Sequence, residues 1–238
     1  MYILSLTDLS FAFIPVVVVL AIMVYQSLQY KTALYALTRM LLQLILIGYF
    51  LIYIFKAESS WTVLATLSVM LLAASWIALR TVGSQQKALY PKALLSITIG
   101  GGLTLILVTQ VVLELQPWYQ PSYMIPLAGM IFANAMTAIS LAVERFETET
   151  SRGTPYQQAA SQAYNTALIP VINGLFAVGL VSLPGMMTGQ ILSGVSPLIA
   201  ARYQIMVMAM IFGASGLSVL LFLQLLKHNF SSQRDNNA

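Results

Sequence analysis

The sequence predicts an all-α polytopic integral membrane protein with about seven transmembrane helices, its N-terminus outside and its C-terminus in the cytoplasm. Of its 238 residues, 59% are apolar and only 8% are charged, whereas soluble domains carry about 25% charged residues. The charged residues separate seven long charge-free stretches, and a helix of about 20 apolar residues crosses a bilayer. The basic residues are also distributed unevenly between the intervening loops.

We expect a single transmembrane domain over residues 1–238, because apolar stretches occupy almost the whole chain. The expected spans are 9–28, 37–55, 62–80, 93–115, 124–142, 168–192 and 203–226. The first span follows Asp8 without a basic n-region and lacks a small-residue cleavage pattern. We therefore expect it to be a retained helix rather than a cleaved signal.

The later spans are justified by where charged and polar residues fall. The second to fifth are apolar runs between charged residues, namely Arg39 and Lys56, Glu58 and Arg80, Lys92 and Glu114, and Glu114 and Glu144. The stretch 153–201 is long enough for two spans, but it opens with a polar, glutamine-rich segment that belongs in water or at the interface. We therefore expect it to contain one span, 168–192, before the last span follows Arg202.

Seven spans place the termini on opposite sides of the membrane, so the basic residues can be assigned to two sides. With the N-terminus outside, nine of the 11 lie inside and two lie outside. The inner set is Lys31, Arg39, Arg80, Lys87, Lys92, Arg145, Arg152, Lys227 and Arg234, and the outer set is Lys56 and Arg202. Because cytoplasmic loops are enriched in Lys and Arg, this distribution favours the stated orientation. Scattered basic residues without a cluster do not indicate a nucleic-acid partner.

The longest internal loop, about 143–167, is expected to be cytoplasmic and is the main surface available to a soluble partner. Its sequence predicts a helix that begins at Pro155 after a Thr154 cap. The alternative interpretation of this segment is a solvated charged turn.

Several kinds of chemistry have no support in the sequence. Cysteine is absent, which excludes disulfides and thiolate metal sites. The deep parts of the spans contain no carboxylate or histidine of the kind that proton-coupled transporters use. Ser215 lies in a Gly-Ala-Ser-Gly sequence similar to that of rhomboid-type proteases, but His228 is about 20 Å further along the same helix. No phosphate-binding P-loop occurs, so any energy from ATP must come from another polypeptide.

Neutral polar residues within the spans are candidates for a translocation path. They are Gln43, Gln110, Asn134, Thr137, Asn173, Thr188 and Gln190, with Met186 and Met187 as possible soft ligands. The alternatives are interhelical hydrogen bonds for the polar side chains and packing for the methionines. No residue is diagnostic of a metal site, so the metal ligands stay unknown.

The sixth span is irregular. Pro170 lies near its start, Pro184 and Gly185 interrupt it, and Gly189 permits close helix contact. Broken helices at membrane depth are tolerated where they line a cavity. We therefore expect the translocation element to lie here.

The residues 167–194 around this break, together with Arg202–Ile205 and Phe212–Ser218, resemble the signature of the FetB/YbbM family of ABC-transporter permeases. Weaker matches are found at residues 39–48 and 129–145, so the resemblance covers essentially the whole chain. It implies an iron export permease of the cell inner membrane, with plant relatives linked to aluminium tolerance.

The resemblance also implies a homodimer paired with a cytoplasmic FetA-like ATPase, which binds ATP and Mg while this chain binds no cofactor. Many such permeases contact the ATPase through a Glu-Ala-Ala-x-x-x-Gly segment. Here Glu147 and Gly153 keep its spacing, with Glu144, Arg145 and Pro155 as flanking candidates. The two alanines are replaced by Thr148 and Glu149.

Two rival functions are an ATP-independent secondary transporter or channel and a membrane-bound enzyme that uses Ser215. The first rival is disfavoured by the lack of an intramembrane carboxylate, and an ATPase gene next to the gene of this chain would also argue against it. Replacement of Ser215 by alanine tests the second.

Overall fold

The structure is a computed structural model that describes residues 5–55 and 59–235, and the regular secondary structure in these ranges consists of helices joined by short turns and loops. An isolated bridge between Val178 and Ser182 is the only β-type pairing in them. The chain forms two compact units, Met1–Glu58 and Ser59–Ala238.

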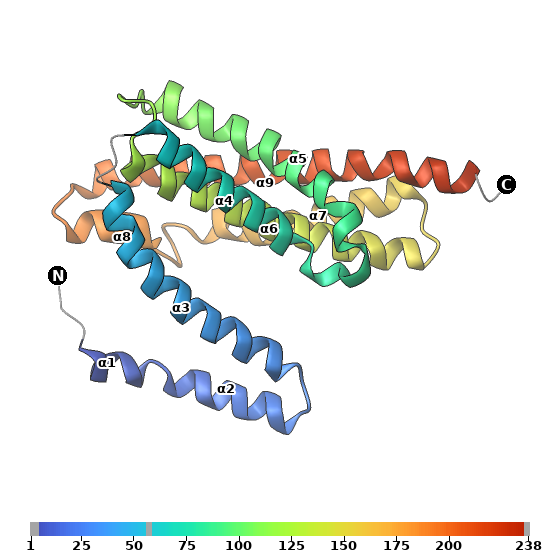
Figure 1. Cartoon of the computed structure of the whole chain (residues 1–238), viewed down its shortest axis with the longest axis horizontal. Coiled ribbons are helices and arrows are strands. Elements are labelled where there is room, and N and C mark those ends of the chain that lie inside the picture. Colours follow the sequence, from blue (N-terminus) through green and yellow to red (C-terminus); the bar gives the residue numbers. More distant parts are fainter. Residues whose placement is uncertain (1–4, 56–58, 236–238) are drawn as a thin grey trace. The chain divides into compact units, whose positions relative to one another are not determined.

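The first unit is a helical hairpin preceded by a short helix (Figure 1). It contains α1 (Leu6–Phe11), α2 (Ile14–Tyr25) and α3 (Tyr30–Phe55), and α2 packs on α3. Ser5 starts α1 with a capping box, in which its hydroxyl oxygen accepts from the Asp8 amide at 3.1 Å. Ser27, in the turn after α2, adopts a positive φ of 54°.

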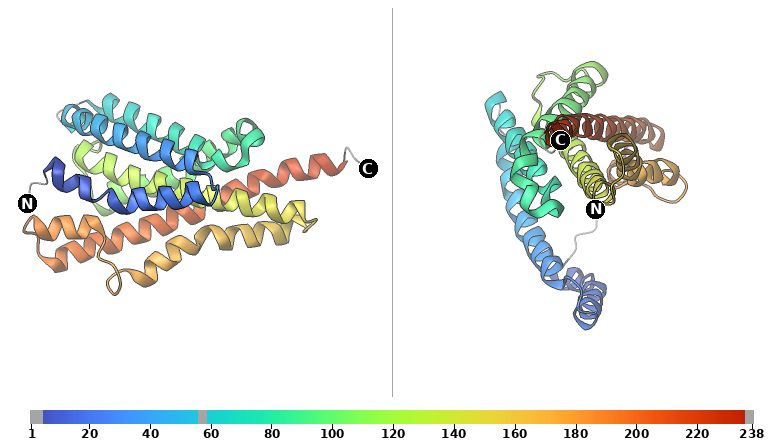
Figure 2. Two further views of the ribbon diagram at one scale, coloured as in Figure 1. Left: turned by 90° about the horizontal axis from the view of Figure 1, so that it is seen from below. Right: turned by 90° about the vertical axis from the view of Figure 1, so that its right-hand side faces the viewer.

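The second unit is a bundle of longer helices. It contains α4 (Ser60–Ala78), the 3-10 helix η1 (Arg80–Gln85), α5 (Gln86–Ile106), the π-helix η2 (Leu107–Val112), α6 (Pro121–Ser151), α7 (Tyr156–Ala177), α8 (Gly185–Leu192) and α9 (Pro197–Asp235). Figure 2 shows that η1, the α6–α7 turn and the C-terminal part of α9 lie at the same end of this unit. The α8–α9 turn lies at the opposite end.

Helix α6 lies at the centre of this bundle and packs against α4, α5, α7 and α9. A row of small side chains allows these contacts, since Ala128, Ala135, Ala138 and Ala142 are all at most 1% exposed. Small residues let membrane helices approach closely, and packing rather than water exclusion holds such helices together.

Helices α5 and α9 approach each other closely at Gly100. A Cβ at this position would lie 2.7 Å from the Ser218 backbone nitrogen, which is too short for a real contact. Ser215, on the same helix as Ser218, is fully buried. Its burial agrees with a packing role and leaves a peptide substrate no access to the hydroxyl.

Six helices among the described residues are long and apolar enough to cross a membrane. They match the first to fifth and the last of the expected spans. The remaining expected span, 168–192, is divided between two helices, because α7 ends at Ala177 and α8 begins at Gly185. Half of α7 is the polar segment that precedes this span, which explains why α7 is not one of the six.

The segment 143–167, expected to connect two spans and to contain a helix from Pro155, is almost entirely helical. Helix α6 continues to Ser151 and α7 starts at Tyr156, so only residues 152–155 are non-helical. The charged segment stays helical because Arg145 and Glu149 pair across one turn and because Thr148 and Thr150 donate to carbonyls four residues back. Thr154 does not cap α7, whose N-cap is Pro155 without a side-chain hydrogen bond.

Pro170, one of the residues expected to make the sixth span irregular, does not break the helix, because α7 runs through this residue without interruption. A proline in a helix removes one backbone hydrogen bond, and neighbouring helices help membrane helices to tolerate that loss. The chain instead leaves the helix after Ala177, where Gly179 has a φ of +83°. This conformation favours glycine, which has no Cβ to clash.

Candidate functional site

The α6–α7 hairpin, defined here as residues 144–162, is the first candidate site. Helix α6 ends in a Schellman motif: the Thr154 amide donates to the Glu149 carbonyl at 3.1 Å, and the Gly153 amide donates to the Thr150 carbonyl at 3.0 Å. Gly153 has the required positive φ of 81°. The turn is thus tight and conformationally defined.

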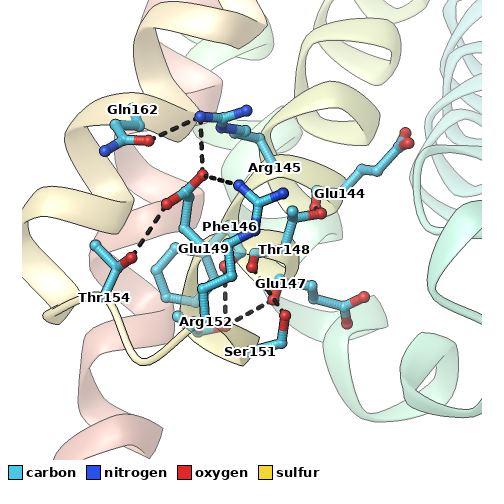
Figure 3. A network of polar contacts seen from close by, with 11 residues as sticks. Glu144, Arg145, Phe146, Glu147, Thr148, Glu149, Ser151, Arg152, Thr154 and Gln162 are labelled. Atoms are coloured by element: carbon cyan, nitrogen blue, oxygen red, sulfur yellow. Dashed lines mark hydrogen bonds and ion pairs between the residues drawn. The ribbon is translucent and has the colours of Figure 1, made fainter.

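A buried carboxylate connects the two sides of this turn (Figure 3). The Glu149 side chain is only 7% exposed, and its Oε1 lies 2.8 Å from Arg145 Nη2. Arg152 lies 3.5 Å from the same oxygen, and the Thr154 hydroxyl donates to Glu149 Oε2 at 3.1 Å. Three groups therefore compensate a charge that would be costly to bury alone.

Arg145 extends this network to the next helix, because its Nη2 also donates to Gln162 Oε1 on α7 at 2.8 Å. Tyr156 adds a contact with α9, where its hydroxyl donates to the Leu223 carbonyl. Its ring meets Phe146 edge to face, with ring centroids 5.6 Å apart. Burial raises the pKa of the Tyr156 phenol above its ordinary value. These contacts therefore connect the ends of α6 and α7 to each other and to α9.

The predicted coupling residues differ in how accessible they are. Glu144 is exposed, and Glu147 is half-buried with a shielded Oε1 that has no hydrogen-bond partner among the described residues. Both side chains point away from Glu149 in Figure 3. Arg145 lies inside the network, whereas Gly153 and Pro155 form the turn. Glu144 and Glu147 are thus the acidic groups that the hairpin leaves free for other contacts.

The helix break between α7 and α8 is the second candidate site. Residues 178–184 separate the two helices, Pro184 is the N-cap of α8, and Gly185 is its first residue. Thr188 donates to the Leu183 carbonyl at 3.4 Å, and Gly189 lies within α8 with open space around it. The break therefore forms a short non-helical segment within the expected span.

A groove of about 430 Å³ opens beside this break, between α7, the break and α9. Met187 lines it from α8, and Gln204 and Met208 line it from α9. Gln204 is 6% exposed. Its Oε1 is shielded and has no hydrogen-bond donor among the described residues.

The other path candidates are not brought together at this groove. Asn134 is half-buried and donates to the Met130 carbonyl of its own helix at 2.8 Å. Asn173 is exposed on α7, while Gln190 of α8 has a shielded Oε1 with no hydrogen-bond partner in the part of the chain that the structure describes. Met186 packs against the core. Gln43 belongs to the first compact unit, where it is exposed on α3.

Two residues of these sites were missed by the sequence analysis. Glu149 was noted only as a replacement of an alanine, although its four-residue spacing from Arg145 indicates an ion pair on a helix. Gln204 was noted only within a matching run, although a polar side chain in a long apolar span is itself a signal. Among the described residues, no cluster of His, Asp and Glu side chains is arranged to hold a metal ion.

Comparisons with known proteins assign nearly the whole chain to one protein family. The model of an uncharacterised protein family, UPF0014, matches residues 6–230. A UPF0014 membrane protein of Synechocystis is 39% identical over 76% of this chain and 76% of its own length. The probable iron export permease protein FetB of Escherichia coli is 32% identical over 97% of this chain and 94% of its own. Protein ALUMINUM SENSITIVE 3 of Arabidopsis thaliana is 38% identical over 77% and 71%, respectively. No solved structure matches the chain.

Proposed function

Since this chain belongs to the UPF0014 family of membrane proteins, we propose that it is the membrane-spanning permease subunit of an ATP-driven exporter. The proposed cargo is iron or a related metal cation, which moves from the cytoplasm to the outside of the cell inner membrane. The name of the Escherichia coli relative, a probable iron export permease, supports this cargo. In the proposed assembly two copies of this permease pair with two copies of a FetA-like ATPase.

The observation that carries this proposal is the construction of the α6–α7 hairpin. It is a rigid turn at one end of the bundle, and α7 leads from it to the helix break without interruption. A push on the hairpin therefore reaches the break through a single helix of 22 residues. A rigid helix with a defined hinge is the usual element for transmitting domain closure.

The distribution of charge supports a cytoplasmic location for this hairpin. Arg80 belongs to η1 and Lys87 to the first turn of α5, Arg145 and Arg152 belong to the α6–α7 hairpin, and Lys227 belongs to the C-terminal part of α9. Figure 2 shows η1, the α6–α7 turn and the C-terminal part of α9 at the same end of the second unit. Arg202 belongs to the first turns of α9, next to the α8–α9 turn at the opposite end (Figure 2). Because basic residues concentrate on the cytoplasmic side, we place the C-terminus in the cytoplasm and the N-terminus outside. The second half of α7 and α8 together supply the sixth span, 168–192, in this arrangement.

The proposed mechanism is alternating access. ATP bound with Mg between the partner subunits closes them around the hairpin, where Glu144 and Glu147 offer acidic groups to basic residues of the partner. The Arg145–Glu149 network keeps the hairpin from deforming, so the motion passes into α7. The break around Pro184 and Gly185 then lets α8 reorient. Asn134, Asn173, Met186, Met187, Thr188 and Gln190 are the proposed path residues.

The test is a reconstitution of the full chain with its candidate ATPase in vesicles. We expect iron transport that requires ATP and is blocked by vanadate. Glu147→Ala is expected to lower both transport and stimulation of the ATPase without loss of membrane insertion. Unchanged coupling in this variant would move the contact to another part of the cytoplasmic surface, such as the segment near Lys87.

A further inference from the structure

A second groove, of about 550 Å³, runs between α9 and the end of α5 with η2. Leu103, Leu107 and Val112 line it from one side, and Ile205 and Leu217 line it from α9. These five side chains are exposed, so the groove opens on the outside of the bundle. Both of its walls belong to helices that are long and apolar enough to cross a membrane. A lipid chain can therefore enter the groove from the bilayer.

The π-helix η2 shapes one wall of this groove. The Leu113 amide donates to the Val108 carbonyl, five residues back, at 3.0 Å. In a regular α-helix, residues five apart point about 140° away from each other. The wider π-turn instead lets Leu107 and Val112 line the same groove. Such turns are rare and are found frequently at functional sites.

One charged residue lies at the end of this apolar lining. Arg202 is the only ionisable side chain among the described residues that line the groove. Its side chain is exposed, and it has no ion pair with a carboxylate among the described residues. A guanidinium group binds phosphate through two parallel N–H···O hydrogen bonds. Arg202 is therefore both accessible and available to an anionic group.

The position of Arg202 places this charge at the depth of lipid headgroups. It belongs to the first turns of α9, at the end of the bundle that contains the α8–α9 turn (Figure 2). Trp118 is 44% exposed, and its carbonyl accepts from Gln110 of η2 at 3.3 Å. Tryptophan is enriched at the membrane interface. From Arg202 to Leu217, α9 rises by about 22 Å, whereas the hydrocarbon of one leaflet is about 15 Å deep. The groove is thus long enough for an acyl chain.

We propose that this groove binds one anionic phospholipid. The phosphate pairs with Arg202, and one acyl chain lies between α5–η2 and α9. The described lining residues include no carboxylate that could pair with the ammonium of a zwitterionic headgroup, so a headgroup with a net negative charge is favoured. Basic pockets between transmembrane helices bind anionic headgroups in this way. The site does not depend on the proposed transport function, and its test requires neither ATP nor a metal.

The test is native mass spectrometry of the purified full-length protein with equal amounts of phosphatidylglycerol and phosphatidylcholine of different mass. We expect one phosphatidylglycerol to be retained in preference to phosphatidylcholine. Arg202→Gln should lower this preference about tenfold, since it removes hydrogen bonds between charged groups, and Arg202→Lys should keep part of it. Arg80→Gln is the matched control, because it removes an exposed arginine of η1, outside the groove. It should leave the preference unchanged.

A second variant tests the apolar part of the site. Gly213 lines the groove, and a Cβ added there has no atom within 4 Å. Gly213→Leu is therefore expected to fold normally, to fill the groove and to reduce retention of either lipid. Gly102→Leu is its control, because Gly102 also has open space around it and does not line the groove.

Equal retention of the two lipids by the unaltered protein would overturn the proposal, as would an unchanged preference in Arg202→Gln. Full retention by Gly213→Leu would show that no acyl chain lies in the groove and would also overturn it. Absence of any retained lipid would have the same meaning, and would indicate that a second copy of the chain or another part of this chain covers the groove.

Discussion

Arg145 and Glu149 form an ion pair of 2.8 Å in the last turns of α6, and the Glu149 side chain is only 7% exposed. The same guanidinium nitrogen reaches Gln162 on α7. A single carboxylate thereby determines how rigidly the turn holds the two helices together. Glu149 is a positioning residue in this account, because it acts through Arg145 and Thr154 rather than through a substrate.

The first prediction concerns this network. Glu149→Ala removes the acceptor of two arginines and of Thr154, and we expect it to destabilise the hairpin by about 2 kcal/mol. We expect the variant to impair the coupling of ATP hydrolysis to transport more than it impairs folding, so fewer cations should move for each ATP hydrolysed. The measurement is the ratio of transport to ATP hydrolysis in vesicles.

The exchange Arg145→Glu with Glu149→Arg should restore part of that ratio, since it restores an ion pair. Glu114→Gln is the control, because Glu114 is an exposed carboxylate in the α5–α6 connection. A loss of folding without any change in the transport ratio would assign Glu149 a purely structural role.

A second prediction concerns Gly153, whose φ of +81° completes the Schellman motif. Gly153→Ala is expected to cost about 1 kcal/mol in unfolding free energy, because a Cβ disfavours this conformation. Gly153→Pro should be worse, since it also removes the hydrogen bond to the Thr150 carbonyl. We expect both variants to insert in the membrane and to stimulate the ATPase less.

Gly48→Ala provides the comparison for Gly153, because Gly48 lies within helix α3 with no atom within 4 Å of an added Cβ. It should leave stimulation unchanged. Equal ATPase stimulation by Gly153→Pro and the unaltered protein would remove the hairpin from the coupling pathway.

A third prediction tests the path. Gln190→Ala and Asn173→Ala are expected to lower transport severalfold, since these are the nearest side-chain amides on either side of the helix break in sequence. Thr109→Ala should have a smaller effect, because its hydroxyl bonds the Leu105 carbonyl within its own helix at 2.8 Å. Initial rates of iron uptake into inverted vesicles give the comparison, and similar losses in all three variants would indicate packing alone.

A fourth prediction concerns the close contact of α5 and α9. Gly100→Ala places a Cβ 2.7 Å from the Ser218 backbone nitrogen, so the helices must separate. We expect a loss of about 1–3 kcal/mol, as for other overpacked positions, visible as a lower thermal unfolding temperature in detergent. Gly102→Ala, two residues away with open space around it, should be neutral. Equal unfolding temperatures for both variants would contradict this contact.

The sequence predicted the helical membrane fold because charged residues cost too much to bury in hydrocarbon and so mark the span limits. It predicted from Pro184 and Gly185 that the sixth span is irregular, but not that this span is divided between α7 and α8 by a non-helical segment. Helix α7 ends at Ala177, and Gly179 allows the positive φ of the turn that follows. Several other glycines in the region would permit the same conformation, so the sequence does not specify where the helix ends.

The sequence did not predict that α6 continues through the charged part of this segment to Ser151. Polarity alone does not distinguish a solvated turn from the end of a long helix. The pairing of Arg145 with Glu149 and the Thr hydroxyls that bond back to carbonyls decide in favour of the helix. The groove at Gln204 depends on how α7, the break and α9 pack, which no local pattern contains.

The central claim is that this permease moves its cargo only with energy supplied through the α6–α7 hairpin. The most direct measurement is iron flux in vesicles that contain the full chain with or without its candidate ATPase. The account predicts vanadate-sensitive, ATP-dependent export with both proteins and no flux with the permease alone. Iron transport by the permease alone would contradict it.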